Sequence, residues 1–218
     1  MKGIDRAALA QVLADGVTAL SLELSDTQHA QLLDYLALMA KWNAVYNLTS
    51  LREPMQMMTH HLLDSLAAVS AFAGAGNVLD VGAGGGLPGI VLAIARPDMH
   101  VSLIDTVHKK TAFLKQVKAE LELSNVTVYT AKVQELAVAQ KFDVITSRAF
   151  ADLSDFVNWS AHLLAEGGQF IALKGVAPPD EQERLPAQWK VSELRALQVP
   201  GLEAERHLIF IKKFSQTT

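Results

Sequence analysis

The sequence predicts an α/β fold: a mostly parallel sheet preceded by a helical lobe. Residues 1–73 carry apolar side chains at helical spacing, whereas from Asn77 onward short β-rich runs alternate with helical stretches. That alternation is typical of a parallel sheet with helices on both faces. The last two β-rich runs are joined by only a short link, which predicts an antiparallel end to the sheet. Half of the 218 residues are hydrophobic, which is ample for a buried core.

The helical lobe is expected to contain two main helices. Ser25 and Asp26 form a helix cap, and the stretch that follows has apolar residues at helical spacing, namely Leu32, Leu33, Leu36, Met39 and Trp42. Residues 47–49 break this helix, and Pro54 opens another one that ends near Phe72. Gly74, Ala75 and Gly76 mark a boundary. We therefore expect a helical lobe over residues 1–73 and a second domain over residues 74–218.

The second domain is expected to hold seven strands. They are Val78–Val81, Val101–Ile104, Val126–Tyr129, Phe142–Thr146, Gln169–Leu173, Val191–Val199 and His207–Lys213. The helices between them are expected at 88–95, 108–120, 133–138 and 152–165. The sequence therefore predicts a seven-stranded, mostly parallel sheet with an antiparallel last strand.

Composition excludes several classes of protein. The chain has no cysteine, which excludes disulfide scaffolds, cysteine-zinc sites and cysteine nucleophiles. His60 and His61 lie on a predicted helix with Asp64, but the two histidines have no third ligand at suitable spacing, so no metal site is predicted. The net charge of −4 means that any nucleic-acid contact must come from a local patch. No apolar run is long enough for a membrane span, and we expect a cytoplasmic monomer.

A glycine-rich loop follows the first strand, and it indicates a nucleoside cofactor. Gly84-x-Gly86-x-x-Gly89 matches the dinucleotide fingerprint, which favours an NAD-dependent oxidoreductase. However, the strand ends two residues too early for that fingerprint, and the Asp80 carboxylate would face a pyrophosphate. Asp80 suits instead the ammonium group of S-adenosylmethionine, and the pattern is similar to the first motif of class I methyltransferases. In either case Asp105 is expected to accept hydrogen bonds from ribose hydroxyls.

Beyond the loop, the sequence resembles the ribosomal small-subunit RNA methyltransferase G family, also called glucose-inhibited division protein B. The matching segments are Trp42-Asn43-x-x-Tyr46-Asn47-Leu48-Thr49, His61-x-x-Asp64-Ser65, the loop from Gly82 to Gly89, Ser147-Arg148-Ala149-Phe150, Leu173-Lys174-Gly175 and Glu205-Arg206-His207-Leu208. The resemblance implies a class I methyltransferase-like Rossmann fold for residues 74–218. It also implies S-adenosylmethionine-dependent methylation of guanine N7 in small-subunit (16S) ribosomal RNA, with that RNA or the 30S subunit as partner.

The candidate cofactor-binding residues come from the motif and from the resemblance together. They are Asp80, Gly82, Gly84, Gly86, Leu87, Asp105, Val133, Gln134 and Arg148. Val133 and Gln134 fall where relatives hold the adenine. Gln134 stands where an acid is common, so we expect a backbone contact there.

The expected chemistry needs no general base. Guanine N7 has a free lone pair and loses no proton on methylation, and the sequence offers no obvious base. Arg148, at the end of a central strand, is the candidate catalytic residue, because its planar fork can address guanine O6 or a phosphate. Phe150 is expected to be a core aromatic rather than a base-stacking residue.

Four lysines within ten residues, Lys109, Lys110, Lys115 and Lys118, form either a solvated helix face or a phosphate-binding patch. Lys109 and Lys110 are the candidate RNA-binding residues. We also expect a hydrogen-bonded pair between His61 and Asp64 that joins the lobe to the second domain. Asn47 and Thr49 either cap helices or line the RNA site. A non-catalytic RNA-binding protein with a methyltransferase fold remains a third alternative.

Overall fold

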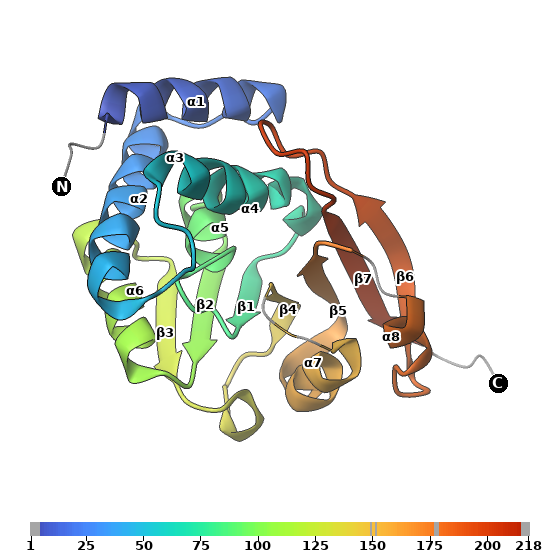
Figure 1. Ribbon diagram of the computed structural model, residues 1–218. Helices are drawn as coiled ribbons and strands as arrows, with labels where there is room; N and C mark the ends of the chain where they lie inside the picture. Colours follow the sequence, from blue (N-terminus) through green and yellow to red (C-terminus); the bar gives the residue numbers. More distant parts are fainter. Residues whose placement is uncertain (1–4, 149, 151, 177–178, 215–218) are drawn as a thin grey trace.

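The computed structural model describes residues 5–148, 150, 152–176 and 179–214. Its centre is a seven-stranded sheet (Figure 1). In chain order the strands are β1 (Asn77–Val81), β2 (His100–Asp105), β3 (Val126–Thr130), β4 (Phe142–Ser147), β5 (Leu164–Lys174), β6 (Trp189–Ala196) and β7 (His207–Lys213). They lie in the order β3-β2-β1-β4-β5-β7-β6.

The strand directions confirm the predicted sheet. β1 to β5 pair in parallel, and β7 runs antiparallel to both β5 and β6. In the central register Val78 lies opposite Val101 on one side and Val144 on the other. The carboxyl ends of β1, β2 and β4 therefore meet at one edge of the sheet, where α/β folds bind their ligands.

The segment before β1 is helical. It contains α1 (Arg6–Ala19), α2 (Asp26–Tyr46), α3 (Pro54–Met57), the π-helix η1 (Met58–Leu63), α4 (Asp64–Ala67) and the 3-10 helix η2 (Val69–Phe72). α2 begins as predicted, with a capping box in which Ser25 and Gln28 exchange hydrogen bonds between side chain and backbone. The helix predicted from Pro54 to near Phe72 is present, but its middle turn is π-helical.

Helices cover both faces of the sheet. They are α5 (Gly89–Ala95), α6 (His108–Glu120), η3 (Val133–Glu135), α7 (Leu153–Ser160), η4 (Ala161–Leu163) and α8 (Pro179–Glu183). Val78 packs in one hydrophobic cluster, which also contains the buried residues of α1, α2, α5 and α6, while the adjacent Leu79 packs in another with α7. Alternate side chains of β1 thus enter opposite layers, as the pleat requires.

Four elements differ from their predicted ranges. The helix predicted over 133–138 is only the single 3-10 turn η3, since six residues are too few to nucleate an isolated helix. The helix predicted over 152–165 ends at Ser160, and β5 begins at Leu164, five residues earlier than predicted. Gly167 and Gly168 hid this part of the strand, because glycine has low strand propensity. β6 covers Trp189–Ala196 rather than Val191–Val199.

Candidate functional site

The glycine-rich loop, residues 82–88, connects the carboxyl end of β1 to α5. Gly82, Gly84 and Gly86 have φ angles of 68°, 55° and 91°. Side chains strain the backbone in this conformation, so the path of the loop depends on glycine. The sequence pattern that indicated a ligand loop therefore corresponds to a tight turn at the ligand-binding edge of the sheet.

Two glycines of this region are also required by packing. A Cβ atom on Gly86 would lie 2.5 Å from Ile90 Cγ1. A Cβ atom on Gly89 would lie 2.2 Å from Leu103 Cδ2 and 2.7 Å from Asp80 Oδ2. Such separations are far inside van der Waals contact. Gly89 thus allows the close approach of α5 to the sheet, and Gly86 allows the loop to pack against α5 and α6, whatever ligand the loop binds.

Asp80 lies beneath the loop. Its side chain is fully buried, and Oδ2 accepts a hydrogen bond from the Gly89 N–H at 2.9 Å. Oδ1 is buried without a hydrogen-bond partner in the part of the chain that the structure describes. Burial raises the pKa of Asp80 to about 7, although the Gly89 N–H favours the charged form. The carboxylate supports the start of α5 and lines neither of the two cavities described next.

The first cavity, of about 280 Å³, opens at the carboxyl ends of β1, β2 and β3. We call it the cofactor cavity because four residues that the sequence predicts to bind the cofactor line it, namely Gly82, Asp105, Val133 and Gln134. Its lining residues are Val81, Gly82, Ile104, Asp105, Thr106, Val107, Lys110, Ala131, Lys132, Val133, Gln134, Phe150 and Trp159.

Asp105 is the buried acidic group of the cofactor cavity. Its Oδ2 accepts from the Gly84 N–H at 3.0 Å, and its Oδ1 accepts from the Val107 N–H at 2.9 Å. The Lys110 ammonium lies 3.8 Å from Oδ2. Asp105 thus fixes the glycine loop against the end of β2 and keeps the position that a ribose-binding acid would need.

Aromatic and aliphatic side chains also line this cavity. The ring centroids of Phe150 and Trp159 lie 5.5 Å apart, and those of Phe150 and Phe156 of the core lie 5.3 Å apart. Val133 is buried and Gln134 is exposed, both at the turn after β3. Phe150 is therefore a partly buried residue that belongs to the core and to the cavity wall alike.

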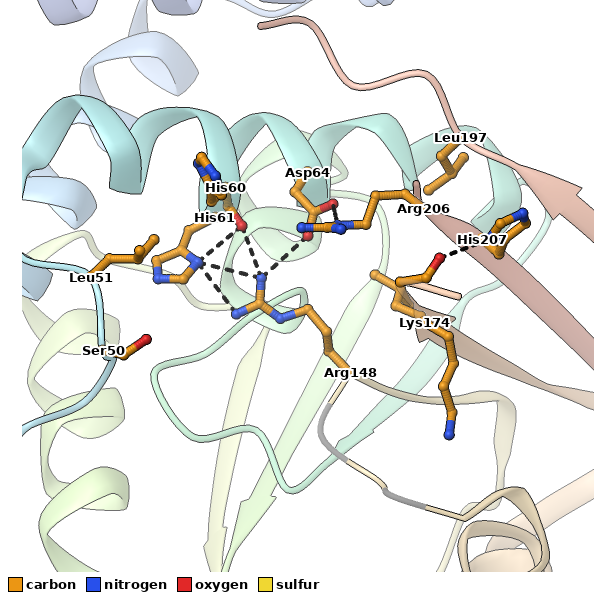
Figure 2. A pocket seen from close by; sticks show the side chains of 12 residues that line it. Ser50, Leu51, His60, His61, Asp64, Arg148, Lys174, Leu197, Arg206 and His207 are labelled. Carbon is orange, nitrogen blue, oxygen red and sulfur yellow. Dashed lines mark hydrogen bonds and ion pairs between the residues drawn. The ribbon is translucent and has the colours of Figure 1, made fainter. Parts of the chain in front are cut away.

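The second cavity, of about 430 Å³, lies between the ends of β4 and β5 and the helical segment (Figure 2). We call it the arginine cavity. It is lined by Ser50, Leu51, His60, His61, Asp64, Arg148, Leu173, Lys174, Gly175, Leu197, Arg206 and His207.

Arg148 enters the arginine cavity from the end of β4 and reaches the helical segment (Figure 2). Its Nη1 lies 3.4 Å from Asp64 Oδ2, and it donates to the His60 carbonyl at 3.3 Å. The His61 Nδ1 atom is 3.5 Å from the guanidinium. Ser147, the residue before Arg148, is fixed to the neighbouring strand, since its hydroxyl donates to the Val81 carbonyl at 2.7 Å.

Asp64 binds two arginines. Arg206 donates from Nε to Asp64 Oδ1 at 2.9 Å, while Arg148 approaches Oδ2. The carboxylate is only 5% exposed, so these ion pairs are shielded from solvent. One buried acid between two guanidinium groups leaves this wall with a net positive charge.

The predicted hydrogen bond between His61 and Asp64 was wrong. His61 Nε2 instead contacts the Thr49 hydroxyl at 2.8 Å, and Asp64 is taken by the arginines. Burial and the nearby Arg148 charge lower the pKa of His61 to about 4, so its ring is neutral near pH 7. The junction between helices and sheet exists, but Arg148 and Arg206 form it.

Asn47 and Thr49, whose roles the sequence left undecided, both make contacts within the protein. Asn47 adopts a positive φ at the end of α2, and its side chain accepts from Arg52 at 2.7 Å. The Thr49 backbone N–H donates to the buried Asn43 side chain at 2.9 Å. Neither residue lines either cavity.

The candidate residues from the sequence separate into groups. Gly82, Asp105, Val133 and Gln134 line the cofactor cavity, and Arg148 lines the arginine cavity. Gly84 and Gly86 shape the loop, and Leu87 is buried in the hydrophobic cluster. Lys110 lies in the wall of the cofactor cavity, whereas Lys109 is exposed on α6. Ala149, part of the matched segment around Arg148, lies outside the described residues.

Sequence reasoning missed several side chains of the site. Trp159, which is 41% exposed and lines the cofactor cavity, lies on α7, a helix that ends earlier than the sequence predicts. Tyr35 donates from its hydroxyl to the Gly85 carbonyl at 2.5 Å, a contact across 50 residues that no local pattern signals. Lys174, by contrast, belongs to a segment that the sequence singled out; it lines the arginine cavity, and its Nζ atom lies 2.7 Å from Glu181 Oε2.

Two negative findings apply to the described part of the chain. No cluster of three or more histidine or acidic side chains is arranged to hold a metal ion there. None of its helices combines the length and the apolar character that crossing a membrane requires.

Comparison with known proteins identifies close relatives. The family model for rRNA small subunit methyltransferase G matches residues 28–209. The ribosomal RNA small subunit methyltransferase G of Janthinobacterium sp. (strain Marseille) is 70% identical over 98% of this chain and 99% of its own length. The protein of that name from Herminiimonas arsenicoxydans is also 70% identical, over 98% of this chain and 100% of its own length.

Comparison with solved structures identifies the fold. The N-methyltransferase NodS from Bradyrhizobium japonicum WM9, in complex with S-adenosyl-L-homocysteine, has a TM-score of 0.56 at 13% identity over 81% of this chain and 100% of its own. The ribosomal protein L11 methylase of Lactobacillus delbrueckii subsp. bulgaricus has a TM-score of 0.55 at 18% identity over 75% and 80% of the two chains. These likenesses confirm the predicted class I methyltransferase-like Rossmann fold.

Proposed function

The chain belongs to the ribosomal RNA small subunit methyltransferase G family, and from this premise we propose that it transfers a methyl group from S-adenosylmethionine to N7 of a guanine in 16S ribosomal RNA. The family match over residues 28–209 is the observation that carries the proposal. The matched range includes every residue that lines the two cavities. The cofactor and the target base would thus be held by residues inside the matched region.

The cofactor cavity suits the adenosine part of S-adenosylmethionine. Val133, Phe150 and Trp159 offer apolar surface for the adenine. Asp105 offers carboxylate oxygens for the ribose, since each oxygen accepts only one backbone N–H and can accept a second hydrogen bond. When bound, the cofactor supplies an electrophilic methyl group on a positively charged sulfur.

The arginine cavity suits the target nucleotide. Arg148 and Arg206 carry two positive charges, and the Asp64 carboxylate to which both bind carries one negative charge. The resulting net positive charge favours binding of a phosphate or of the guanine O6 atom. N7 uses its own lone pair and releases no proton, so the task of these residues is to orient the base. His61, with its pKa of about 4, is a weak base, and this reaction requires none.

Neither alternative is favoured. The literal dinucleotide pattern includes Gly86 and Gly89, whose lack of a side chain is explained by packing against Ile90 and Leu103. The family to which the chain belongs is one of methyltransferases, which speaks against both an oxidoreductase and a non-catalytic protein.

Incubation with methyl-labelled S-adenosylmethionine tests the proposal. The substrate is small-subunit particles from cells that lack this enzyme, with naked 16S RNA in parallel, and the product is digested to nucleosides. We expect label in 7-methylguanosine at one position. Label on an exocyclic amine or a ribose oxygen would contradict the N7 assignment. Absence of label together with intact S-adenosylhomocysteine binding would instead favour the non-catalytic alternative.

The proposed role of Arg148 gives a first prediction. Arg148→Lys should lower turnover about 10- to 100-fold, because an ammonium cannot contact Asp64, the His60 carbonyl and a substrate together, and small misplacements are costly. Affinity for S-adenosylhomocysteine should change little. Arg195→Lys, on β6 and away from both cavities, is the matched control. Full activity of Arg148→Lys would remove Arg148 from the proposed mechanism.

A further inference from the structure

We propose that Tyr35 is a positioning residue of the cofactor site, so that helix α2 of the N-terminal segment takes part in cofactor binding. The inference rests on the proposed function, because it requires that the glycine loop bind S-adenosylmethionine. It assigns a role in that site to a residue outside the predicted domain of residues 74–218.

The contact between Tyr35 and the loop is direct and buried. The Tyr35 side chain has no exposed surface, and its hydroxyl donates to the Gly85 carbonyl at 2.5 Å. Its ring stacks with Phe113 of α6 at a centroid distance of 6.4 Å, which fixes the direction of the hydroxyl. Burial raises the pKa of Tyr35 well above its ordinary value, so the hydroxyl keeps its proton and remains a donor.

Tyr35 belongs to a face of α2 that also contacts the end of α5 and the residue after α6. Gln28 Nε2 donates to the Ile94 carbonyl at 2.8 Å, at the end of α5. Gln31 Nε2 donates to the Leu121 carbonyl at 2.9 Å, just after α6. Positions 28, 31 and 35 follow one another at helical spacing and therefore share a face. Figure 1 shows α2 running alongside α6, with α5 close by.

The loop has little room to move toward α2. A Cβ atom on Gly86 would lie 2.8 Å from Leu114 Cδ2 and 3.2 Å from the Tyr35 hydroxyl oxygen. On the other side, Asp105 accepts from the Gly84 N–H. The loop is therefore held from β2 and from α2 at once, and Tyr35 supplies the hydrogen bond on the α2 side.

Removing the hydroxyl should weaken cofactor binding without removing any cofactor contact. The Gly85 residue is partly exposed, so water can replace the lost donor. The loop would then sample more conformations, and binding would have to restrict them. The net value of one hydrogen bond corresponds to an affinity loss of about 3- to 10-fold.

Calorimetric titration with S-adenosylhomocysteine tests the inference on Tyr35→Phe. Tyr46→Phe is the matched control, since it makes the same change on the same helix at a side chain that is 41% exposed. We expect weaker binding for Tyr35→Phe only, with KM for S-adenosylmethionine raised more than kcat is lowered. A lower melting temperature with unchanged affinity would show a merely structural role and overturn the inference. Failure of the wild-type protein to bind would instead overturn the proposed function.

Hydrogen-deuterium exchange on the wild-type protein provides a second measurement that does not depend on folding of a variant. S-adenosylhomocysteine should slow exchange at backbone amides of α2 around Tyr35 as well as in the loop. Protection confined to the loop and the cofactor cavity, with α2 unchanged, would overturn the inference.

Discussion

At the scale of single residues, Asp80 has a structural contact at the edge of the sheet where α/β folds bind their ligands. Its position at the end of β1 suggested a ligand contact, but its Oδ2 atom accepts from the Gly89 N–H under the loop. The carboxyl group is completely buried, and this burial raises its pKa to about 7 because it outweighs the Gly89 hydrogen bond and the Arg148 charge, which both lower the pKa. Asp80 should therefore influence stability in a pH-dependent manner.

The pH dependence of Asp80 has a definite sign. The folded-state pKa of about 7 exceeds the ordinary value of 3.8, so the stability associated with this group is complete below about pH 4 and is lost as pH rises through 7. Asp80→Asn cannot ionise, and its stability relative to wild type should rise between about pH 5 and about pH 8. Urea denaturation at both pH values measures this difference. Asp34→Asn, at an exposed position, is the control; a difference that stays constant or falls with pH would refute the assignment.

At the scale of elements, the π-helical turn η1 explains the geometry of the arginine cavity. It carries His60 and His61 and is followed at once by Asp64, so a carbonyl, a neutral ring nitrogen and a carboxylate all face Arg148. π-helical turns are frequent at functional sites. The residue types could be read from the sequence, but their common direction depends on the turn.

We expect Lys109 and Lys110 of helix α6 to have different roles. Lys109→Ala should reduce the salt dependence of RNA binding, by about 0.7 to 0.9 in the slope of log affinity against log salt, since fewer counterions are released. Lys110 lines the cofactor cavity 3.8 Å from Asp105, so Lys110→Ala should also change affinity for S-adenosylhomocysteine. Lys141→Ala, at the start of β4 and outside both cavities, is the control for both measurements. An unchanged slope for Lys109→Ala would mean that its side chain is only solvated surface.

At the scale of the whole molecule, the helical segment and one face of the sheet share a single hydrophobic cluster. Leu36 of α2, Ile90 of α5, Leu114 of α6 and Leu208 of β7 all belong to it. The chain changes from helices to strands between Phe72 and Asn77, where the sequence predicts a domain boundary. Packing continues across that point.

The shared cluster predicts one cooperative unfolding transition. Differential scanning calorimetry should give equal calorimetric and van't Hoff enthalpies. S-adenosylhomocysteine should move the whole transition upward in temperature, because it binds only the folded state. Two separate transitions, with only the second one moved by the ligand, would support independent domains instead.

The sequence predicted the sheet and its direction well, because β-rich runs, glycine turns and linker lengths are local signals. It predicted Asp105, Val133 and Gln134 as cofactor residues, and these line the cofactor cavity. It could not predict that Asp64 is shared by Arg148 and Arg206, or that Tyr35 reaches Gly85, because those contacts join distant segments. The start of β5 was predicted too late, because this long strand contains Gly167 and Gly168.

The position of α2 has a consequence for folding on the ribosome. α2 is synthesised after α1 but before the other elements that share its hydrophobic cluster, including α5, α6 and β7. Until those elements emerge, the burial of Leu32, Leu36 and Met39 is incomplete. A nascent chain in this state exposes apolar surface, which makes it a substrate for chaperones and prone to aggregation. The hydrogen bond between Tyr35 and Gly85 therefore cannot form until another 50 residues have followed Tyr35 out of the ribosome.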